Sequence, residues 1–295
     1  MTIRDELPHN QHFVPQHYLK GFADSCERTH LWVYNKGWPY SKGTKSNRRN
    51  PFRQAIRSAG ARRDIYSLTT IDGRRVQDAY EKTIARQEEI GLPILRKLRA
   101  RESLSLADKV AFSVYIDLMM DRVPAMAVNA APFIRSAMKE YSWDLLRRKS
   151  AEEGLFSVAR RFDPDLTESV EAVERQLLLE GIVQRSPTIV KQLASMTWQL
   201  FLAGGDRVFP TTDNPAFRPK QLGLGKENGF LVMPIDSRLA LLISNVVTPD
   251  CSYTPATTKQ FNLLVGVVLS GATAQAYACR SERSILRRLS GSKYR

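Results

Sequence analysis

Apolar positions in the middle of the chain recur at helical spacing. Val76, Tyr80 and Ile84 follow one another at every fourth residue, which places them on one face of a helix. The pattern continues past Gly91 and Pro93, where a helix should kink or divide because proline lacks the amide proton that the previous turn needs. The sequence therefore predicts a helical middle section that is interrupted once.

Residues with capping preferences mark where further helices begin and end. Ser105 and Asp108 have the spacing of a capping box in front of the apolar run KVAFSVYIDLMM. Pro124 should end that helix and begin another. Apolar periodicity also predicts helices around 170–179 and over 187–202.

Short apolar segments bounded by turn residues flank this helical section and predict strands. HLWVYNKG (30–37) and DIYSLTTIDG (64–73) each end in a turn sequence, with a short helix expected between them at 52–58. On the C-terminal side we expect strands at 207–217, 229–236, 238–245 and 275–279 and a helix at 258–272. This order predicts an α+β fold in which the N-terminal and C-terminal strands form one mixed or antiparallel sheet. We expect a single domain over 1–295, with a division near 150–165 as the alternative.

The net charge of +14 changes this picture because it is unevenly distributed. Between Arg28 and Arg63 the chain carries ten basic residues and no acidic one. A stretch without carboxylates of its own is solvated or meets anions from outside, and the phosphates of nucleic acid are the commonest such anions. The expected contacts with RNA or DNA are Arg48, Arg49, Arg53, Arg57, Arg62 and Arg63. The alternative is a solvated basic loop.

Cysteine content and hydropathy indicate the compartment. Cys26, Cys251 and Cys279 form no CxxC pair and leave one thiol over in any disulfide scheme. The first ten residues lack the apolar core of a signal peptide, and polar residues interrupt the most apolar segment, 261–278. We therefore expect a cytoplasmic protein that does not contact a membrane.

All four histidines lie in the first thirty residues, and His12 is the best candidate for chemistry. A short helix is predicted after Pro15, so His12 would precede its N-terminus, where the helix dipole keeps imidazole neutral and attracts anions. A neutral imidazole beside an anion suits a general base. The alternative is that His12 only fixes the entry into the helix. A zinc site of His12, His17, Cys26 and His30 has spacings that fit no zinc template.

The sequence TTDNP, Thr211–Pro215, is the second candidate. Asp213 and Asn214 would lie at the end of a strand, where the carboxylate could hold a divalent metal or orient a histidine. The alternative is a turn in which Asp213 accepts hydrogen bonds from nearby backbone amides. We expect Asp213 and His12 as ligands if a metal is bound. Glu81 and Glu88 fall on one predicted helix, where such pairs are usually surface residues.

These motifs together resemble those of a bacterial family grouped as domain of unknown function 4238, or DUF4238. Its motif His-x-x-Pro-x-x-Tyr-Leu-x-x-Phe is matched by His12, Pro15, Tyr18, Leu19 and Phe22. Helical glutamates, Arg-x-Pro, Thr-x-Asp-Asn-Pro and a proline after a strand are matched by Glu81, Glu88, Arg122, Pro124, Thr211–Pro215 and Pro234. The resemblance implies a shared fold and a common site for His12 and Asp213, but it supplies no activity.

Our leading functional prediction is a nucleic-acid-acting protein, in the form of a metal-assisted phosphodiesterase. His12 would be the general base or a ligand, and Asp213 with Asn214 would place the metal or the base. The alternatives are a noncatalytic module that binds nucleic acid or regulates, and a hydrolase for a small phosphorylated metabolite. No Walker, GxGxxG, HExxH, GxSxG or kinase signature is present.

Overall fold

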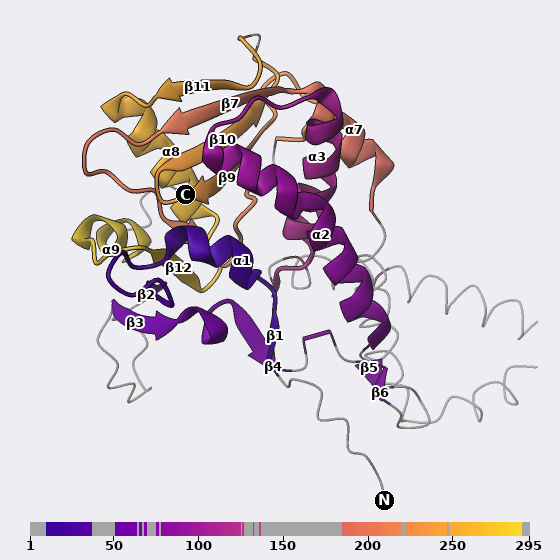
Figure 1. The fold of residues 1–295 in the computed structure, drawn as a ribbon, viewed down its shortest axis with the longest axis vertical. Helices are drawn as coiled ribbons and strands as arrows, with labels where there is room; N and C mark the ends of the chain where they lie inside the picture. The colour runs from indigo at the N-terminus through magenta and orange to yellow at the C-terminus, as the bar shows by residue number, and fades with distance from the viewer. Residues whose placement is uncertain are drawn as a thin grey trace, which may run out of the picture. The chain divides into compact units, whose positions relative to one another are not determined.

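A computed structural model gives the fold (Figure 1). It describes residues 10–36, 51–63, 65–66, 68–69, 75–76, 78–124, 185–219, 222–246 and 248–290, and the single positions 126, 132 and 136. The chain divides into two compact units, the first made of 1–65, 86–123 and 185–295 and the second of 66–85 and 124–184. In the second unit, β5 (Leu68–Thr69) pairs antiparallel with β6 (Arg75–Val76). The alternative boundary at 150–165 lies outside the described residues.

The first unit contains an antiparallel sheet built from both ends of the chain. Its order is β3-β2-β12-β8, formed by Phe52–Ala55, His30–Asn35, Gln275–Ala278 and Thr211–Thr212. Tyr34 of β2 lies opposite Ala276 of β12, so strands about 240 positions apart are direct neighbours. This pairing confirms that N-terminal and C-terminal strands share a sheet.

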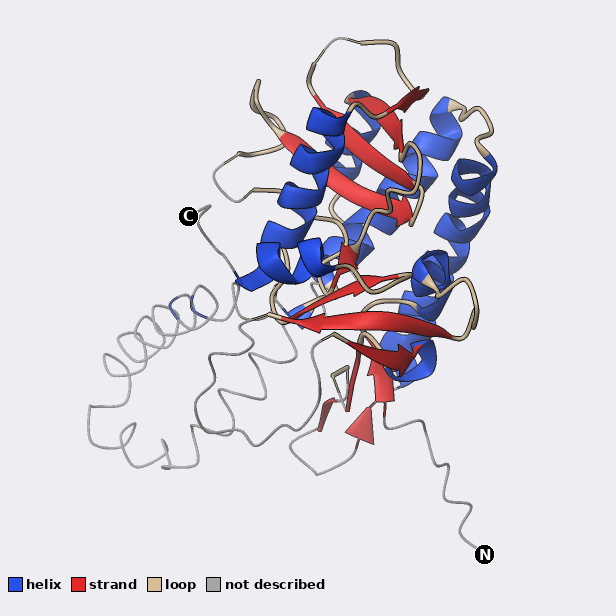
Figure 2. Cartoon of the chain, turned by 90° about the vertical axis from the view of Figure 1, so that its left-hand side faces the viewer, coloured by secondary structure: helices blue, strands red, loops and turns tan. Residues whose placement is uncertain are grey.

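The remaining C-terminal strands form a second sheet. The strands on either side of the helical middle section therefore belong to two main sheets. Its order is β11-β7-β10-β9, formed by Ser252–Pro255, Thr197–Leu202, Leu239–Ser244 and Phe230–Asp236. The pair β11–β7 is parallel and the other pairs are antiparallel. In Figures 1 and 2 this sheet lies above the sheet that contains β2 and β12.

A two-stranded ribbon joins β1 (Asn10–His12) to β4 (Ala61–Arg63), with His12 opposite Ala61. Between β3 and β4 lies a 3-10 turn, Ile56–Ser58. After β1 the chain enters the short helix α1 (Gln16–Leu19), which a 3-10 turn at Lys20–Phe22 continues. The ribbon thus connects the basic stretch directly to the histidine-rich segment.

The longer helices are named by their bounds: α2 (Asp78–Ala100), α3 (Leu106–Asp121), α7 (Pro187–Ser195), α8 (Thr258–Ser270) and α9 (Arg283–Ser290). The expected capping box at α3 is present: the Asp108 amide donates to Ser105 Oγ at 3.1 Å, and the Ser105 amide donates to Asp108 Oδ2 at 2.9 Å. The helix expected at 258–272 and the strands expected at 30–37, 229–236, 238–245 and 275–279 are confirmed within a few residues.

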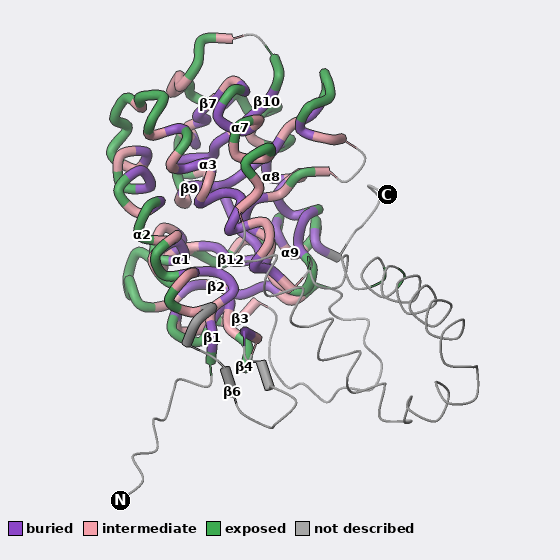
Figure 3. Tube along the Cα trace, turned by 90° about the vertical axis from the view of Figure 1, so that its right-hand side faces the viewer, coloured by how far each residue is buried: buried purple, intermediate pink, exposed green. Residues whose placement is uncertain are grey.

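Helices cover both faces of the second sheet, and the alternation along β7 shows how. Trp198 contacts Phe112 of α3, with ring centroids 6.0 Å apart. Phe201, at odd spacing from Trp198 and hence on the opposite face, belongs to the core cluster that contains Leu264 and Val268 of α8. Figure 3 shows β9 and β10 of the second sheet and β12 of the first as largely buried, whereas the edge strands β3 and β11 contain no buried residue.

Three of the predicted helix and strand ranges are wrong. Residues 197–202 form β7 instead of extending the helix at 187, because the apolar run TWQLFL pairs along its whole length with β10. Residues 52–55 are strand β3, paired with β2, and only the 3-10 turn that follows is helical. In 207–217 the strand is limited to Thr211–Thr212.

Pro93 does not divide α2, which runs through it. The nearby Gly91 lies directly against α3: a Cβ at this position would be 2.3 Å from the Tyr115 ring. Gly91 is therefore explained by the close approach of two helices and does not break the helix. Within the described residues, no helix has the length and apolar character that crossing a membrane requires.

Candidate functional site

Tyr18 anchors the histidine-rich segment to two strands. Pro15 precedes the first turn of α1, and Tyr18 is fully buried. The Tyr18 hydroxyl donates to the carbonyl of Pro234 in β9 at 2.6 Å and therefore accepts from Thr211 Oγ1 of β8 at 2.9 Å. Three residues named by the family resemblance thus meet at one hydroxyl group.

His17, the next residue back, lies between a carboxylate and a phenol. Its Nε2 is 2.9 Å from the Tyr115 hydroxyl, and its Nδ1 is 3.4 Å from Glu88 Oε2. The side chains of His17 and Glu88 are each 20% exposed, whereas Tyr115 is fully buried. Burial lowers the pKa of His17 to about 4 although Glu88 opposes the shift, and burial raises the pKa of Tyr115. At neutral pH Tyr115 therefore donates to a neutral imidazole, and the Nδ1 proton faces Glu88.

Arg122 completes this group at the C-terminal cap of α3. It donates to Glu88 Oε1 and to the carbonyl of His12, and its side chain is only 3% exposed. Glu88 therefore accepts from the cation and faces the imidazole at the same time. We call His17, Glu88, Tyr115 and Arg122 the α1–α3 polar cluster; it ties β1, α1, α2 and α3 together.

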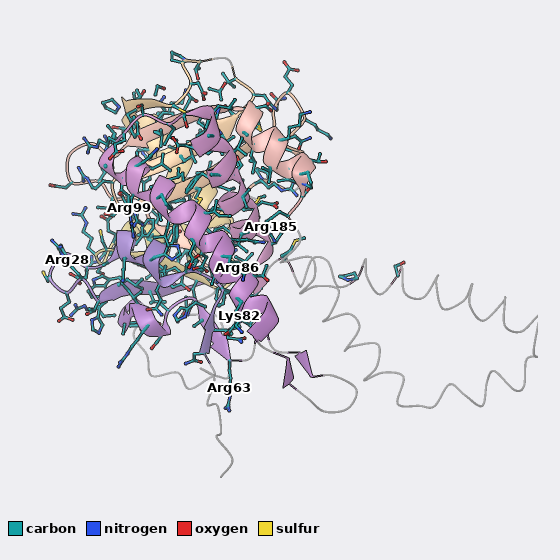
Figure 4. The ribbon with its side chains drawn as sticks, turned by 45° about the vertical axis from the view of Figure 1, so that its right-hand side comes forward. Arg28, Arg63, Lys82, Arg86, Arg99 and Arg185 are labelled. Atoms are coloured by element: carbon teal, nitrogen blue, oxygen red, sulfur yellow. The ribbon has the colours of Figure 1, made fainter. Side chains whose placement is uncertain are left out.

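Arg99 satisfies the carbonyls that the short helix α1 leaves without intrahelical partners. Its guanidinium donates to the carbonyls of Tyr18 at 3.0 Å, His17 at 3.3 Å and Ile235 at 3.1 Å. It lies so close to Gly21 that a Cβ there would be 2.4 Å from Nη2. Figure 4 shows Arg99 between α1 and the second sheet. This arginine is occupied by structural contacts.

His12 lies in β1, immediately before the cluster. Its pKa is lowered, first because the imidazole is buried and also because Arg122 is a nearby cation, while hydrogen bonding to the backbone of Ile56 and Arg57 opposes the shift. The imidazole is thus favoured in its neutral form, but burial rather than the four-residue helix α1 is the main cause.

Asp213 is held by a different segment of the chain. Its carboxylate accepts from the amides of Thr273 at 2.8 Å, Ala274 at 2.6 Å and Gln275 at 3.1 Å, so both oxygens are engaged. Burial raises the pKa of Asp213, and these three donors oppose that shift. Asn214 Nδ2 donates to the carbonyl of Gly271 at 3.3 Å. The TTDNP sequence therefore fixes the loop between α8 and β12.

The predicted phosphate-binding arginines differ in their surroundings. Arg53 pairs with Asp24 at 3.3 Å and Glu27 at 3.2 Å, two acids that lie just before the basic stretch. Arg57 and Arg62 are exposed, and Arg62 lies 5.9 Å from the centre of the Phe13 ring. Arg63 is also exposed, at the end of β4 (Figure 4). Arg48 and Arg49 lie outside the described residues.

Sequence reasoning missed a second charged group on α3. Asp117 Oδ2 and Asp121 Oδ2 lie 3.5 Å and 3.6 Å from Nη1 of Arg185. A signal was present in the sequence, because the run KVAFSVYIDLMM is apolar on most sides of the helix, so an aspartate within it is expected to be buried and to need partners. His17 and Tyr115 were missed as a pair because only the fold brings α1 and α3 together.

Among the described residues, no group of three or more His, Cys, Asp or Glu side chains is arranged to hold a metal ion. His12 and Asp213, the expected ligands, are accordingly not part of such a group. The same holds for the zinc alternative with His17, Cys26 and His30.

Comparison with known proteins gives one match. The family model described as "Protein of unknown function (DUF4238)" matches residues 10–282, so the chain belongs to that family. Neither the curated proteins nor the solved structures contain a match.

Proposed function

We propose that this DUF4238 protein binds nucleic acid and that the segment from β3 to β4 contacts the phosphates. The observation that carries the proposal is the exposure of Arg57 and Arg62 in a stretch without carboxylates. The two arginines lie five positions apart, one on the 3-10 turn and one on β4. Exposed guanidinium groups of this kind bind phosphate oxygens without sequence preference.

Two nearby acids weaken the contribution of one exposed arginine of this segment. Asp24 and Glu27 neutralise Arg53, so Arg53 contributes less to phosphate binding than its place in the sequence suggests. The Phe13 ring supports Arg62 through a cation–π contact that leaves the guanidinium accessible. We assign the main contacts to Arg57 and Arg62 and a further contact to Arg63, which is also exposed on β4.

Binding is favoured over hydrolysis by the state of Asp213. A metal ligand needs free carboxylate lone pairs, and three backbone amides already take up most of those of Asp213. In the catalytic version of the proposal His12, Asp213 and Asn214 keep their predicted roles. A noncatalytic module, by contrast, is compatible with the hydrogen bonds that these three residues make in the structure.

Fluorescence anisotropy with labelled RNA and DNA tests the binding. The double variant Arg57→Ala/Arg62→Ala is compared with Lys259→Ala/Arg283→Ala, which removes the same charge from exposed positions on α8 and α9. We expect the first variant to bind about tenfold more weakly at low salt, with a salt slope reduced by about 2 on duplex DNA. The control should bind like the wild type. Equal binding by both variants, or equal loss in both, contradicts the assignment.

Incubation of the same nucleic acids with Mg²⁺ or Mn²⁺ distinguishes the two versions. Cleavage that disappears in His12→Ala supports the phosphodiesterase. Salt-sensitive binding without turnover supports the noncatalytic module.

A further inference from the structure

Two carboxylates on α3 share one guanidinium group. Asp117 and Asp121 are one helical turn apart, and Nη1 of Arg185 lies 3.5 Å from the first and 3.6 Å from the second. The side chains are 3% and 23% exposed, and that of Arg185 is 13% exposed. Solvent therefore screens these charges poorly.

The same group holds the beginning of α7. The amide of Ser186 donates to Asp117 Oδ2 at 3.1 Å, and Ser186 Oγ accepts from the amide of Ile189 at 3.3 Å as the N-cap of α7. Asp121 and Arg185 also lie near the two ends of segment 124–184 in the sequence. The chain leaves the first unit after Val123 and returns to it at Arg185. The ion pair between Asp121 and Arg185 thus connects the two parts of the first unit between which segment 124–184 is inserted.

The charged neighbours of Asp121 have opposite effects on its pKa. Burial and the neighbouring Asp117 raise the pKa of Asp121 to about 7, although Arg185 and Arg218 lower it. Arg122 is a further cation close to Arg185. Ionising both carboxylates in this poorly solvated place carries a cost, which shifts the second ionisation toward neutral pH.

We propose that Asp117, Asp121 and Arg185 form a pH-responsive clamp that holds the start of α7 on α3 and loosens when Asp121 loses its proton. With Asp121 protonated, Arg185 faces the single charge of Asp117, which also accepts from Ser186. Ionised Asp121 repels Asp117 and competes for Arg185. The proposal does not depend on nucleic-acid binding.

The sign of the effect follows from linkage. A carboxyl group whose pKa is raised by folding stabilises the protein at low pH, and this contribution disappears as pH rises through the folded-state pKa. His12 and His17 have lowered pKa values and act in the opposite direction, so the pH profile of the wild type alone is not diagnostic. The informative quantity is the difference between the wild type and a variant at position 121.

Chemical denaturation of the full chain at about pH 6 and pH 8 tests the clamp. Asp121→Asn keeps the size of the side chain and fixes the neutral form. From about pH 6 to pH 8, we expect the unfolding constant of the wild type to rise about tenfold relative to that of Asp121→Asn. Asp206→Asn, at an exposed carboxylate, is the control and should follow the wild type.

Hydrogen exchange locates the change. After correction for intrinsic rates, amides at the start of α7 should exchange faster at the higher pH in the wild type but not in Asp121→Asn. Should Asp121→Asn denature with the same pH dependence as the wild type, the clamp is ruled out. A pH effect on exchange that is spread evenly over the chain also contradicts it.

Discussion

The hydroxyl of Tyr18 donates to the carbonyl of Pro234 at 2.6 Å, across 216 positions of the sequence. This bond and the contact with Thr211 fix α1 on β9 and β8. Arg99 holds the same segment through the carbonyls of Tyr18 and Ile235. A helix of four residues has little stability alone, so these contacts determine its position.

Tyr18→Phe should destabilise the protein by about 1–3 kcal/mol, because the buried carbonyl of Pro234 and hydroxyl of Thr211 lose their partner. Urea denaturation measures the change. Tyr253→Phe removes a more exposed hydrogen bond to Glu102 and should cost less. Similar losses in the two variants would contradict the anchoring role.

Glu88→Ala should destabilise by about 3 kcal/mol, since it leaves the buried guanidinium of Arg122 without its carboxylate. Glu89→Ala, an exposed neighbour on α2, is the matched control and should change stability by less than about 0.5 kcal/mol. Thermal unfolding of the three proteins gives the comparison. A Glu88→Ala protein as stable as the control would show that the Glu88–Arg122 ion pair does not contribute to stability.

Stability should fall on acidification through His17. Its pKa is about 4 in the folded protein and about 6.5 when unfolded, so its contribution is complete above the unfolded value and is lost as pH falls toward the folded one. Between about pH 7.5 and pH 5 the wild type should lose about 1–2 kcal/mol more than His17→Gln. Denaturation at the two pH values checks this, and parallel losses in both proteins would refute it.

Asp213→Ala should destabilise by about 2 kcal/mol, because three buried amides lose their acceptor and the loop before β12 loses its support. Asp213→Asn, which can still accept hydrogen bonds, should lose less. If Asp213 were a catalytic or metal-binding group instead, Asp213→Asn would abolish cleavage while its stability stayed near that of the wild type. Denaturation and a nuclease assay on both variants separate these outcomes.

The elements that sequence predicted well carry their own local signals. The capping residues of α3 and the turn sequences that bound β2, β9 and β10 act within a few neighbouring positions. The prediction failed at β7, because an apolar run of six residues suits a helix or a buried strand equally until a partner strand is known. Strands as short as β1 and β4 carry no pattern that a sequence can reveal.

The site was predicted less completely than the fold. The family motifs include Glu88, Arg122 and Tyr18, but the partners of these residues depend on which surfaces of α1, α2 and α3 meet. The sequence suggests His17 only as a metal ligand, because its contact with Tyr115 spans 98 positions. Long-range pairings of this kind are properties of the packed chain, and local spacing does not contain them.

The pairing of β2 with β12 also affects how the protein is made. During synthesis β2 can pair with β3 early, but its other edge has no partner until residues near 278 have left the ribosome, so this sheet closes only about 240 residues after β2 is made. Such late closure lengthens the time for which an apolar strand edge is available to other nascent chains. Products truncated before Gln275 would keep that edge open permanently, which makes them candidates for aggregation and for chaperone capture.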